Sequence, residues 1–272
     1  MTPRVSVVIV SYETRDELEA CLRSLAAEGG PDLETIVVDN ASSDGSADLV
    51  ARDFPAVRLL RNERNQGFGA ACNRGAAVAG APYLLFLNSD AQVTAGAVDA
   101  LARALDARPD VAVVGPRTLN GDGSAQVSFG PALTPLAEWR QRRLVRGVAR
   151  RDPDALRVAH QRSLVASEPD WVSGSCLMIR RRAFDAASGF DEGFFLYEED
   201  VDLCVRVRAA GGRVRFEPAA TVVHRLGASM SRVPDRARAE YDRSHLRYYR
   251  KHNGVIATWL LRSAIAIRSL LR

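Results

Sequence analysis

The segment Pro82-Tyr-Leu-Leu-Phe-Leu-Asn-Ser-Asp90 decides the fold that this sequence predicts. Its apolar run lies between a proline and the polar cluster Asn88-Ser89-Asp90. A short apolar run between turn signals is typical of a strand buried on both faces. The polar end of such a strand opens at the carboxyl edge of a sheet, where α/β folds bind ligands. Asp90 is therefore a candidate binding residue, although an aspartate that caps the next helix would have the same pattern.

The sequence on both sides of this segment alternates between strand and helix patterns. Apolar runs predict strands at 5–10, 33–38, 57–60 and 111–114, with helical spacing between them. Strands that alternate with helices imply parallel βαβ crossovers. We therefore predict an α/β fold with a Rossmann-like, mostly parallel sheet flanked by helices.

The chain is less regular after Gly115. Residues 120–170 are rich in glycine, proline and arginine, and we expect a mobile, partly helical excursion there. A kinked strand is predicted over 170–179, a helix over 199–210, and two short strands that end at His224. Residues 248–272 form an amphipathic helical pattern with arginines on one side. Such a helix either lies on an anionic membrane or docks on the domain.

Composition limits the class of protein. A chain of 272 residues, 47% of them hydrophobic, can bury a full core. Its four cysteines are far apart and lack metal-binding spacing, which indicates free thiols in a reducing compartment. No uncharged apolar run approaches the ~18 residues of a membrane span. We therefore expect a cytoplasmic protein, and the net charge of only +4 argues against a nucleic-acid partner.

Common nucleotide-binding and hydrolase motifs are absent. A Rossmann dehydrogenase needs G-x-G-x-x-G after its first strand, but that turn reads Ser11-Tyr12-Glu13. The nearest imitation, Gly67-Phe-Gly69, has Cys72 in place of the third glycine. The P-loop, G-x-S-x-G and H-E-x-x-H patterns do not occur either.

The strand ends suggest a binding site instead. In a parallel sheet Ser11, Asp39 and Asp90 reach the same edge. Asp39 could accept a hydrogen bond from a pyrimidine ring, with the phosphates running towards Asp90. A carboxylate beside a diphosphate requires a bridging cation such as Mg²⁺. His224 could add a nitrogen ligand, which favours Mn²⁺, or could be an ordinary core or surface histidine.

A second acidic cluster, Tyr197-Glu-Glu-Asp-Val-Asp202, lies at a predicted helix start. A carboxylate there could remove the proton from an attacking hydroxyl. Asp200 lies one turn before Cys204 and shares its buried face, whereas Asp202 is rotated away. Acids at helix N-termini also occur only because the helix dipole favours them, so both interpretations stay open.

Several segments together resemble the inverting glycosyltransferases of family 2, which have a GT-A fold, and the rhamnosyltransferase-like members above all. The similarity covers roughly residues 4–230. The segments are Val5–Tyr12, Val38–Ser46, Asn65–Asn73, Leu87–Asp90, Trp171–Met178, Gly189–Phe195, Glu199–Asp202 and Val223-His224.

The resemblance implies a role for each matching residue. Asn88-Ser89-Asp90 corresponds to the metal-binding DxD motif, with Asp90 and His224 on the cation and Asp200 as the base. Asn88 departs from the usual first aspartate, which predicts weaker metal binding unless the donor is present. The residues expected to contact substrate are Ser11, Tyr12, Asp39, Asn65, Gly67, Asn73, Asn88, Ser89, Trp171, Gly174 and Glu199.

The predicted enzyme is thus an inverting, divalent-cation-dependent (Mg²⁺ or Mn²⁺) hexosyltransferase. Its donor is expected to be dTDP-L-rhamnose, with a UDP-hexose such as galactofuranose or glucose as the alternative. Its acceptor is a glycan or lipid-linked glycan of the bacterial surface, and the last helix would hold it at the inner membrane face. Residues 1–115 would bind the nucleotide sugar, 116–230 would form the metal- and acceptor-side half, and 231–272 a helical extension. A glycoside hydrolase and a non-catalytic polysaccharide-binding module are the more remote alternatives.

Overall fold

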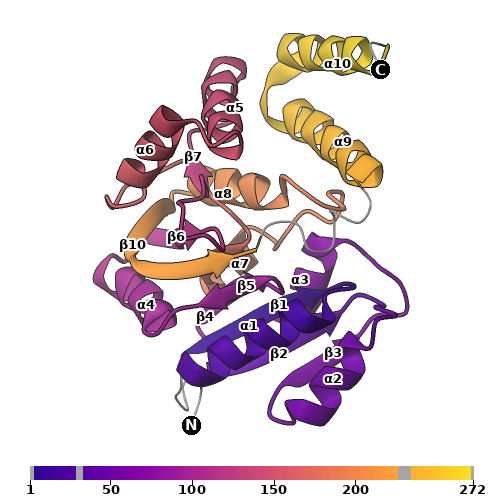
Figure 1. Ribbon diagram of the computed structural model, residues 1–272, viewed down its shortest axis with the longest axis vertical. Coiled ribbons are helices and arrows are strands. Elements are labelled where there is room, and N and C mark those ends of the chain that lie inside the picture. Colours follow the sequence, from indigo (N-terminus) through magenta and orange to yellow (C-terminus); the bar gives the residue numbers. More distant parts are fainter. Residues whose placement is uncertain (1–2, 29–32, 226–233, 271–272) are drawn as a thin grey trace.

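The computed structural model describes residues 3–28, 33–225 and 234–270. An eight-stranded sheet in the order β3-β2-β1-β4-β9-β6-β10-β5 forms the centre, and helices cover both of its faces (Figure 1). The strands are β1 (Val5–Ser11), β2 (Leu33–Asp39), β3 (Arg58–Arg61), β4 (Tyr83–Asn88), β5 (Ala91–Val93), β6 (Val111–Leu119), β7 (Phe129–Gly130), β8 (Trp171–Val172), β9 (Cys176–Arg180) and β10 (Arg213–His224). The helices are α1 (Arg15–Glu28), α2 (Ser46–Asp53), α3 (Phe68–Val78), α4 (Ala97–Ala107), α5 (Pro135–Ala149), α6 (Pro153–Arg162), α7 (Arg181–Ala186), α8 (Glu199–Ala209), α9 (Pro234–His252) and α10 (Gly254–Leu270).

The central strands are buried on both faces, as their unbroken apolar sequences predict. Every residue of β1 is buried, and β1 pairs in parallel with β2 and β4. The register places Ser11 beside Asp39 and Val10 beside Asn88. The carboxyl ends of these three strands therefore lie at one edge of the sheet, where the polar residues of the sequence are concentrated.

Two hydrophobic cores hold the helices against the sheet. One core joins α1 and α4 to one face, and the other joins α3, α7 and α8 to the opposite face. Alternate residues of a strand serve the two cores: Leu85 packs into the first and Phe86 into the second. This alternation follows from the side-chain period of a strand. Because both faces of β4 pack into a hydrophobic core, consecutive residues of this strand must be apolar.

The sheet is mixed rather than purely parallel. The strand predicted over 170–179 is broken at Ser173-Gly174-Ser175: β8 pairs with β7 in a separate two-stranded ribbon, and β9 enters the main sheet. There β9 runs antiparallel between β4 and β6. The two strands predicted before His224 are one strand, β10, with an irregularity between Glu217 and Thr221. Strands from both halves of the chain therefore share one sheet.

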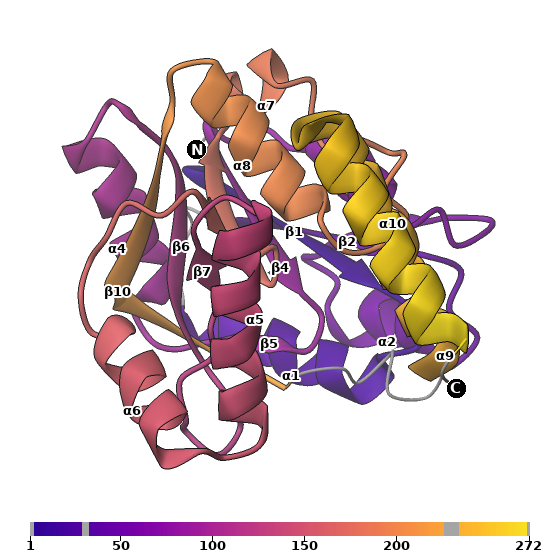
Figure 2. The same ribbon diagram turned by 90° about the horizontal axis from the view of Figure 1, so that it is seen from above.

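The helices of two long segments differ from the prediction. The excursion at 120–170 contains the complete helices α5 and α6. The predicted single C-terminal helix is two helices, because the chain turns at Gly254, whose φ is +71°. Tyr248 consequently belongs to α9, while residues 271–272 lie outside the described part of the chain. Seen from above, α5 and α10 lie on either side of a gap (Figure 2). No described helix is long and apolar enough to cross a membrane.

Candidate functional site

Asp90 and His224 meet at the carboxyl edge of the sheet. Asp90 lies in the turn after β4, and His224 ends β10, which pairs antiparallel with β5 so that His224 lies opposite Ala91. The Nε2 atom of His224 is 3.1 Å from Oδ1 of Asp90. The two side chains are only 7% and 9% exposed. The fold thus brings together the two residues predicted as metal ligands.

The hydrogen bonds of Gln126 fix the protonation of His224. The amide nitrogen of Gln126 donates to Asn120 Oδ1 and to the His224 carbonyl, so its Oε1 is the atom that faces the imidazole. Oε1 lies 3.1 Å from His224 Nδ1, which must therefore carry the hydrogen. Asn88 Nδ2 lies 3.3 Å from Nε2 and can donate to its lone pair. His224 consequently directs Nε2, the ring nitrogen that Gln126 does not hold, towards Asp90.

This arrangement fits a divalent cation. A carboxylate oxygen and an imidazole lone pair repel one another at 3.1 Å unless a cation or a proton lies between them. Metal-binding histidines usually donate their other ring hydrogen to an oxygen acceptor, as His224 does to Gln126. No group of three or more His, Cys, Asp or Glu side chains forms a metal cage in the described ranges. Donor phosphates would supply the remaining ligands, which is common for Mg²⁺.

Ser89 and Ser11 belong to a hydroxyl network beneath Asp90. Thr14 Oγ1 donates to Ser89 Oγ at 2.8 Å and lies 3.3 Å from Ser11 Oγ. All three residues are buried. The Thr14 hydroxyl thus joins the end of β1 to the turn after β4. The neighbouring Tyr12 is partly exposed at the same edge.

Asp39 ends β2 with one carboxylate oxygen unsatisfied. Oδ2 accepts from the Ser42 backbone N–H at 3.1 Å, whereas Oδ1 is buried without a hydrogen-bond partner in the described part of the chain. Burial raises the pKa of Asp39, although the hydrogen bonds from Ser42 oppose that rise. An unsatisfied buried acceptor is unfavourable. The site therefore lacks a donor at Oδ1.

The loop before α3 is shaped by an asparagine cluster. Asn40 donates to Asn65 Oδ1 and to the Gly67 carbonyl, and it accepts from Asn62. Gly67 has a φ of +89°, and a Cβ there would lie 2.5 Å from the Phe195 carbonyl oxygen. Only glycine permits this approach. Asn65 and Gly67 therefore position the loop against the segment before α8.

Asn73 has a different environment from the one predicted for a nucleotide contact. Its amide donates to the Phe190 carbonyl and to Glu192, and its Oδ1 accepts from the Phe190 N–H. Both ends of the side chain are thus bonded to the 189–192 loop. Asn73 fastens α3 to that loop.

Asp200 lies in the first turn of α8 and faces the Ser173-Gly174-Ser175 kink. Its Oδ2 accepts from the Gly174 N–H at 2.6 Å, and its Oδ1 accepts from the Val201 N–H at 2.8 Å. Burial raises the pKa of Asp200 to about 6, even though these two hydrogen bonds favour the anion. The side chain remains partly accessible. Asp200 is therefore an anion at neutral pH with a pKa suited to accepting a proton.

Glu199 differs from its neighbour. It is almost fully buried, and its Oε2 has no hydrogen-bond partner among the described residues. Burial, followed by the negative charge of Asp200, raises the pKa of Glu199 well above its usual value. Opposite protonation states of adjacent carboxyl groups often separate an acid from a base. Burial therefore disfavours the anionic form of Glu199.

A short chain of contacts connects Asp200 to the Asp90–His224 pair. Gly174 donates to Asp200, and the Asn88 N–H donates to the Ser175 carbonyl at 3.0 Å. The Asn88 side chain then contacts His224. The predicted base and the predicted metal ligands are therefore on opposite sides of the kink between β8 and β9.

Trp171 stands at the outer side of this kink. Its indole N–H donates to the Pro131 carbonyl at 2.8 Å, and the ring is partly exposed. Gly130, its partner in the β7–β8 ribbon, precedes the segment that leads into α5. Trp171 thus joins the kink to the segment that precedes α5.

Two acids of the second cluster serve the packing of α9. Asp202 is fully buried and pairs with Arg206, Lys251 and His252. Glu198 pairs with His245, which also contacts Glu138 on α5. Burial alone would lower the pKa of His245, but these two carboxylates raise it to about 8.

Several functional positions were not predicted, namely Thr14, Asn40 and Gln126. Each acts by orienting a neighbour rather than by facing the cleft. Gln126 lies in an irregular, glycine-rich segment, so no periodicity singles it out. Asn40 follows the end of a predicted strand, and this position was the one feature of the sequence that could have marked it as part of the site.

Comparisons with known proteins identify the family of this chain. The model of the family described as "Glycosyl transferase family 2" matches residues 6–186. The chain is 32% identical to an N-acetylglucosaminyl-diphospho-decaprenol L-rhamnosyltransferase of Mycobacterium tuberculosis, over 99% of this chain and 92% of that protein. It is 29% identical to the succinoglycan biosynthesis protein ExoO of Rhizobium meliloti, over 85% of this chain and 63% of that protein.

Solved structures share the fold. GalNAc-T7, determined with UDP, GalNAc and Mn²⁺, gives a TM-score of 0.65 at 17% identity and covers 92% of this chain and 48% of its own. Staphylococcus aureus TarS in complex with UDP-GlcNAc gives 0.59 at 18% identity and covers 84% of this chain and 60% of its own. These likenesses confirm the predicted GT-A fold.

Proposed function

We infer the reaction from one premise: this chain belongs to glycosyltransferase family 2. It is a glycosyltransferase, which decides against the hydrolase and binding-module alternatives. We propose that it moves L-rhamnose from a nucleoside-diphosphate donor to a hydroxyl of a lipid-linked glycan, with inversion at the anomeric carbon. The observation that carries the proposal is the Asp200 carboxylate, which is held by two backbone N–H groups on a partly exposed residue.

Asp200 performs the proton transfer in the proposed mechanism. The acceptor hydroxyl approaches between Trp171 and the Gly174 kink and loses its proton to Asp200 as its oxygen attacks the sugar. The backbone N–H of Gly174 holds the carboxylate in place, so little reorganisation is needed during the reaction. A single displacement of this kind inverts the configuration of the sugar. Glu199, whose buried Oε2 has no partner among the described residues, is proposed to contact the transferred sugar.

Asp39 is proposed to receive the base of the donor. Its buried Oδ1 has no partner in the described part of the chain, and the ring N–H of thymine or uracil would satisfy it. Tyr12 and the loop of Asn65 and Gly67 border the same edge. Both pyrimidines carry this N–H, so Asp39 accepts either dTDP or UDP.

Asp90 and His224 are proposed to hold a divalent cation, and Asn88 contacts the phosphates or the ribose. The Nε2 lone pair and the carboxylate oxygen face one another in the orientation that such an ion requires. A bound cation offsets the negative charge of a diphosphate leaving group. Ser89 and Ser11 hold the turn in which Asp90 lies.

L-Rhamnose and the lipid-linked acceptor are proposed from the mycobacterial relative, whose name specifies both. The alternative is a UDP-hexose donor, since TarS, which shares the fold, binds UDP-GlcNAc. A lipid-linked acceptor would place the reaction at the cytoplasmic face of the membrane, in the synthesis of a surface polysaccharide.

A donor screen tests this proposal. The purified chain is incubated with Mn²⁺ or Mg²⁺, an N-acetylglucosaminyl-diphospho-lipid and either dTDP-L-rhamnose, UDP-galactofuranose or UDP-glucose. We expect transfer from dTDP-L-rhamnose, with a product linkage opposite in anomeric configuration to the donor. Transfer from a UDP-hexose alone would support the alternative donor. Retention of configuration would contradict the role of Asp200.

A further inference from the structure

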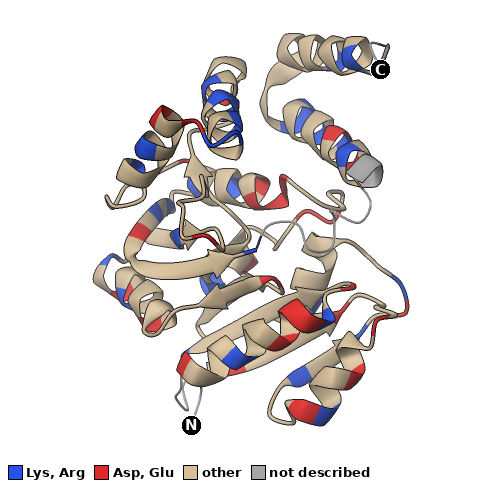
Figure 3. Ribbon diagram, viewed as in Figure 1, with Lys and Arg blue, Asp and Glu red and all other residues tan. Residues whose placement is uncertain are grey.

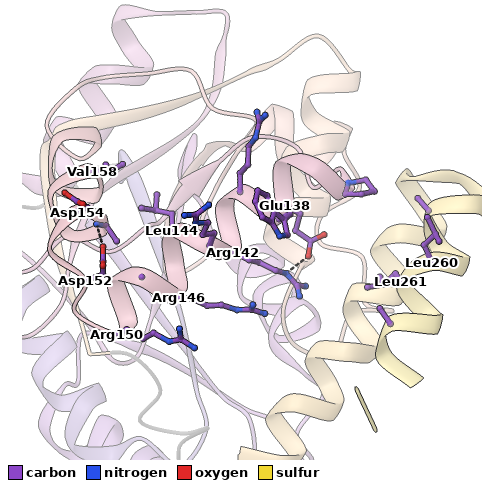
Figure 4. A pocket seen from close by; sticks show the side chains of 18 of the residues that line it. Glu138, Arg142, Leu144, Arg146, Arg150, Asp152, Asp154, Val158, Leu260 and Leu261 are labelled. Atoms are coloured by element: carbon purple, nitrogen blue, oxygen red, sulfur yellow. Dashed lines mark hydrogen bonds and ion pairs between the residues drawn. The ribbon is translucent and has the colours of Figure 1, made fainter. Parts of the chain in front are cut away.

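A groove of about 920 Å³ separates α5 from α10. Its lining comes from α5, α6, α9 and α10 and includes none of the residues assigned above to the donor, the cation or the base. Figures 2 and 4 show the two helices facing one another across this space. The groove is therefore a concave surface separate from the residues at the strand ends.

One wall of the groove is basic. It carries four exposed arginines of α5 and the residue after it, and none of them forms an ion pair within the described ranges. They are Arg140, Arg143, Arg146 and Arg150. The acids at the lower rim are already engaged: Asp152 accepts from the Ala155 N–H, and Asp154 pairs with Arg157. Figure 3 shows this concentration of basic residues on α5.

The opposite wall is apolar. It consists of small and aliphatic residues of α10, namely Ala257, Leu260, Leu261 and Ala264. Leu260 is 65% exposed, and Trp139 on the basic side is 59% exposed. Exposed apolar surface of this extent usually marks a binding site. Figure 4 shows Arg146 on α5 and Arg150, the residue after α5, on the side of the groove opposite Leu261 of α10.

We propose that this groove binds the diphosphate and the first apolar units of the lipid that carries the acceptor sugar, an inference that rests on the proposed function. The unpaired guanidinium groups of α5 suit a diphosphate, because Arg binds phosphate oxygens through paired N–H donors. The α10 wall suits the hydrocarbon chain next to that head group. Two facing walls of opposite character fit one amphiphilic molecule better than a flat bilayer surface.

The groove also lies on the acceptor side of the active site. Glu138, which lines it, contacts His245, and His245 contacts Glu198, two positions before Asp200. α5 begins directly after the segment that holds the Trp171 indole. A lipid diphosphate on the α5 arginines would thus direct its sugar towards Asp200, with Trp171 beside the path.

A binding experiment tests the inference without a complete acceptor. Farnesyl diphosphate, a short isoprenoid diphosphate, is titrated into the full chain while tryptophan fluorescence is followed, since Trp139 lines the groove. A chelator is present so that diphosphate does not bind through a cation at Asp90. We expect binding at least about tenfold tighter than that of inorganic diphosphate, because the tail adds apolar contact.

The test variant carries Arg146→Gln and Arg150→Gln. It should bind farnesyl diphosphate about tenfold more weakly or worse, because charge-assisted contacts are lost. The matched control carries Arg23→Gln and Arg52→Gln, two exposed arginines on α1 and α2 with the same change in charge, and should bind as the wild type does. Equal affinity of the test variant and the wild type would overturn the inference.

A second arm separates this lipid from the bilayer itself. The same variants are sedimented with phosphatidylcholine vesicles containing phosphatidylglycerol. Loss of vesicle binding in the test variant with unchanged farnesyl diphosphate binding would overturn the lipid site in favour of a membrane surface. Failure of the proposed function gives a different result: no sugar transfer in the donor screen, with farnesyl diphosphate binding intact.

Discussion

The Nε2 atom of His224 lies 3.1 Å from Oδ1 of Asp90, and the hydrogen bond between Gln126 and Nδ1 holds the ring in the orientation that brings the two atoms together. Gln126 therefore prepares the pair for a cation without touching it. We predict that Gln126→Leu weakens the apparent affinity for Mn²⁺ by about 10–100-fold, the usual cost of losing the outer partner of a metal-binding histidine.

A metal titration of the transfer rate at saturating donor measures this effect. Gln161→Leu, at an exposed position of α6, is the control and should leave the titration unchanged. An unaltered Mn²⁺ dependence in Gln126→Leu would show that the orientation of His224 does not depend on Gln126.

Gly174 is the closest backbone neighbour of the Asp200 side chain. A Cβ at position 174 would lie 3.1 Å from the Asp200 Cβ, so the carboxylate would have to shift. We predict that Gly174→Ala lowers kcat by about 10²-fold, since small misplacements of a catalytic group are costly. The affinity for the donor should not change, because Asp39 and Asp90 are unaffected.

Gly80→Ala is the matched control for this substitution. The nearest side-chain atom to a Cβ there is Glu34 Oε2 at 3.8 Å, an ordinary contact, and kcat should stay at the wild-type value. Steady-state kinetics of both variants at saturating donor measure this difference in kcat. A Gly174→Ala enzyme with wild-type kcat would mean that the position of Asp200 is not set by the kink.

The parts of the fold that could be predicted are those in which local pattern and tertiary environment agree. The run from Tyr83 to Leu87 is apolar throughout because both of its faces are covered, and the same holds for β1. Polar residues at the ends of such strands must lie at the sheet edge, which is why Asp39 and Asp90 could be placed together. The helical phase relative to Cys204 did not predict burial correctly: Asp202, predicted to be rotated away, is fully buried against α9, whereas Asp200 is partly exposed.

Other features depend on long-range contacts that no local pattern reports. The insertion of β9 between β4 and β6 is decided by pairing across the sheet, not by the sequence of residues 176–180. The family resemblance named Asn73 as a substrate contact, and only the structure shows that its side chain bonds to Phe190 and Glu192. The break between α9 and α10 has a local cause, the left-handed backbone of Gly254. The apolar periodicity continues across this position, so the sequence pattern predicted one helix.

Asp202 anchors α9 to α8 rather than serving the reaction. It is fully buried and contacts Arg206, Lys251 and His252, so its loss leaves cations without their shared partner. We predict that Asp202→Ala lowers the free energy of unfolding by about 3–5 kcal/mol, as for other broken buried pairs. Chemical denaturation monitored by circular dichroism gives the value.

Asp242→Ala serves as the control for Asp202→Ala. Asp242 pairs with Arg268 between α9 and α10, but both side chains are partly exposed. Its loss should cost at most about 1 kcal/mol. Equal destabilisation by the two substitutions would contradict the anchoring role of Asp202.

The pH dependence of transfer should follow Asp200. A base acts only as the anion, and burial raises the pKa of Asp200 to about 6. The rate at saturating donor should therefore be constant well above pH 6, fall to half near pH 6, and decrease about tenfold per unit below it. Donor affinity measured over the same range separates this loss from weaker binding. A rate that stays constant down to pH 4.5 would be inconsistent with Asp200 as the base.

The central claim is that Asp200 removes the proton of the acceptor while other residues hold the donor. The most direct test is single-turnover transfer by Asp200→Asn, with the affinity for the nucleotide sugar measured by calorimetry on the same protein. Transfer should slow by about 10²–10⁴-fold, the usual contribution of a general base, while donor affinity remains within about twofold of the wild type because the donor contacts lie elsewhere. Transfer at the wild-type rate in this variant would contradict the account.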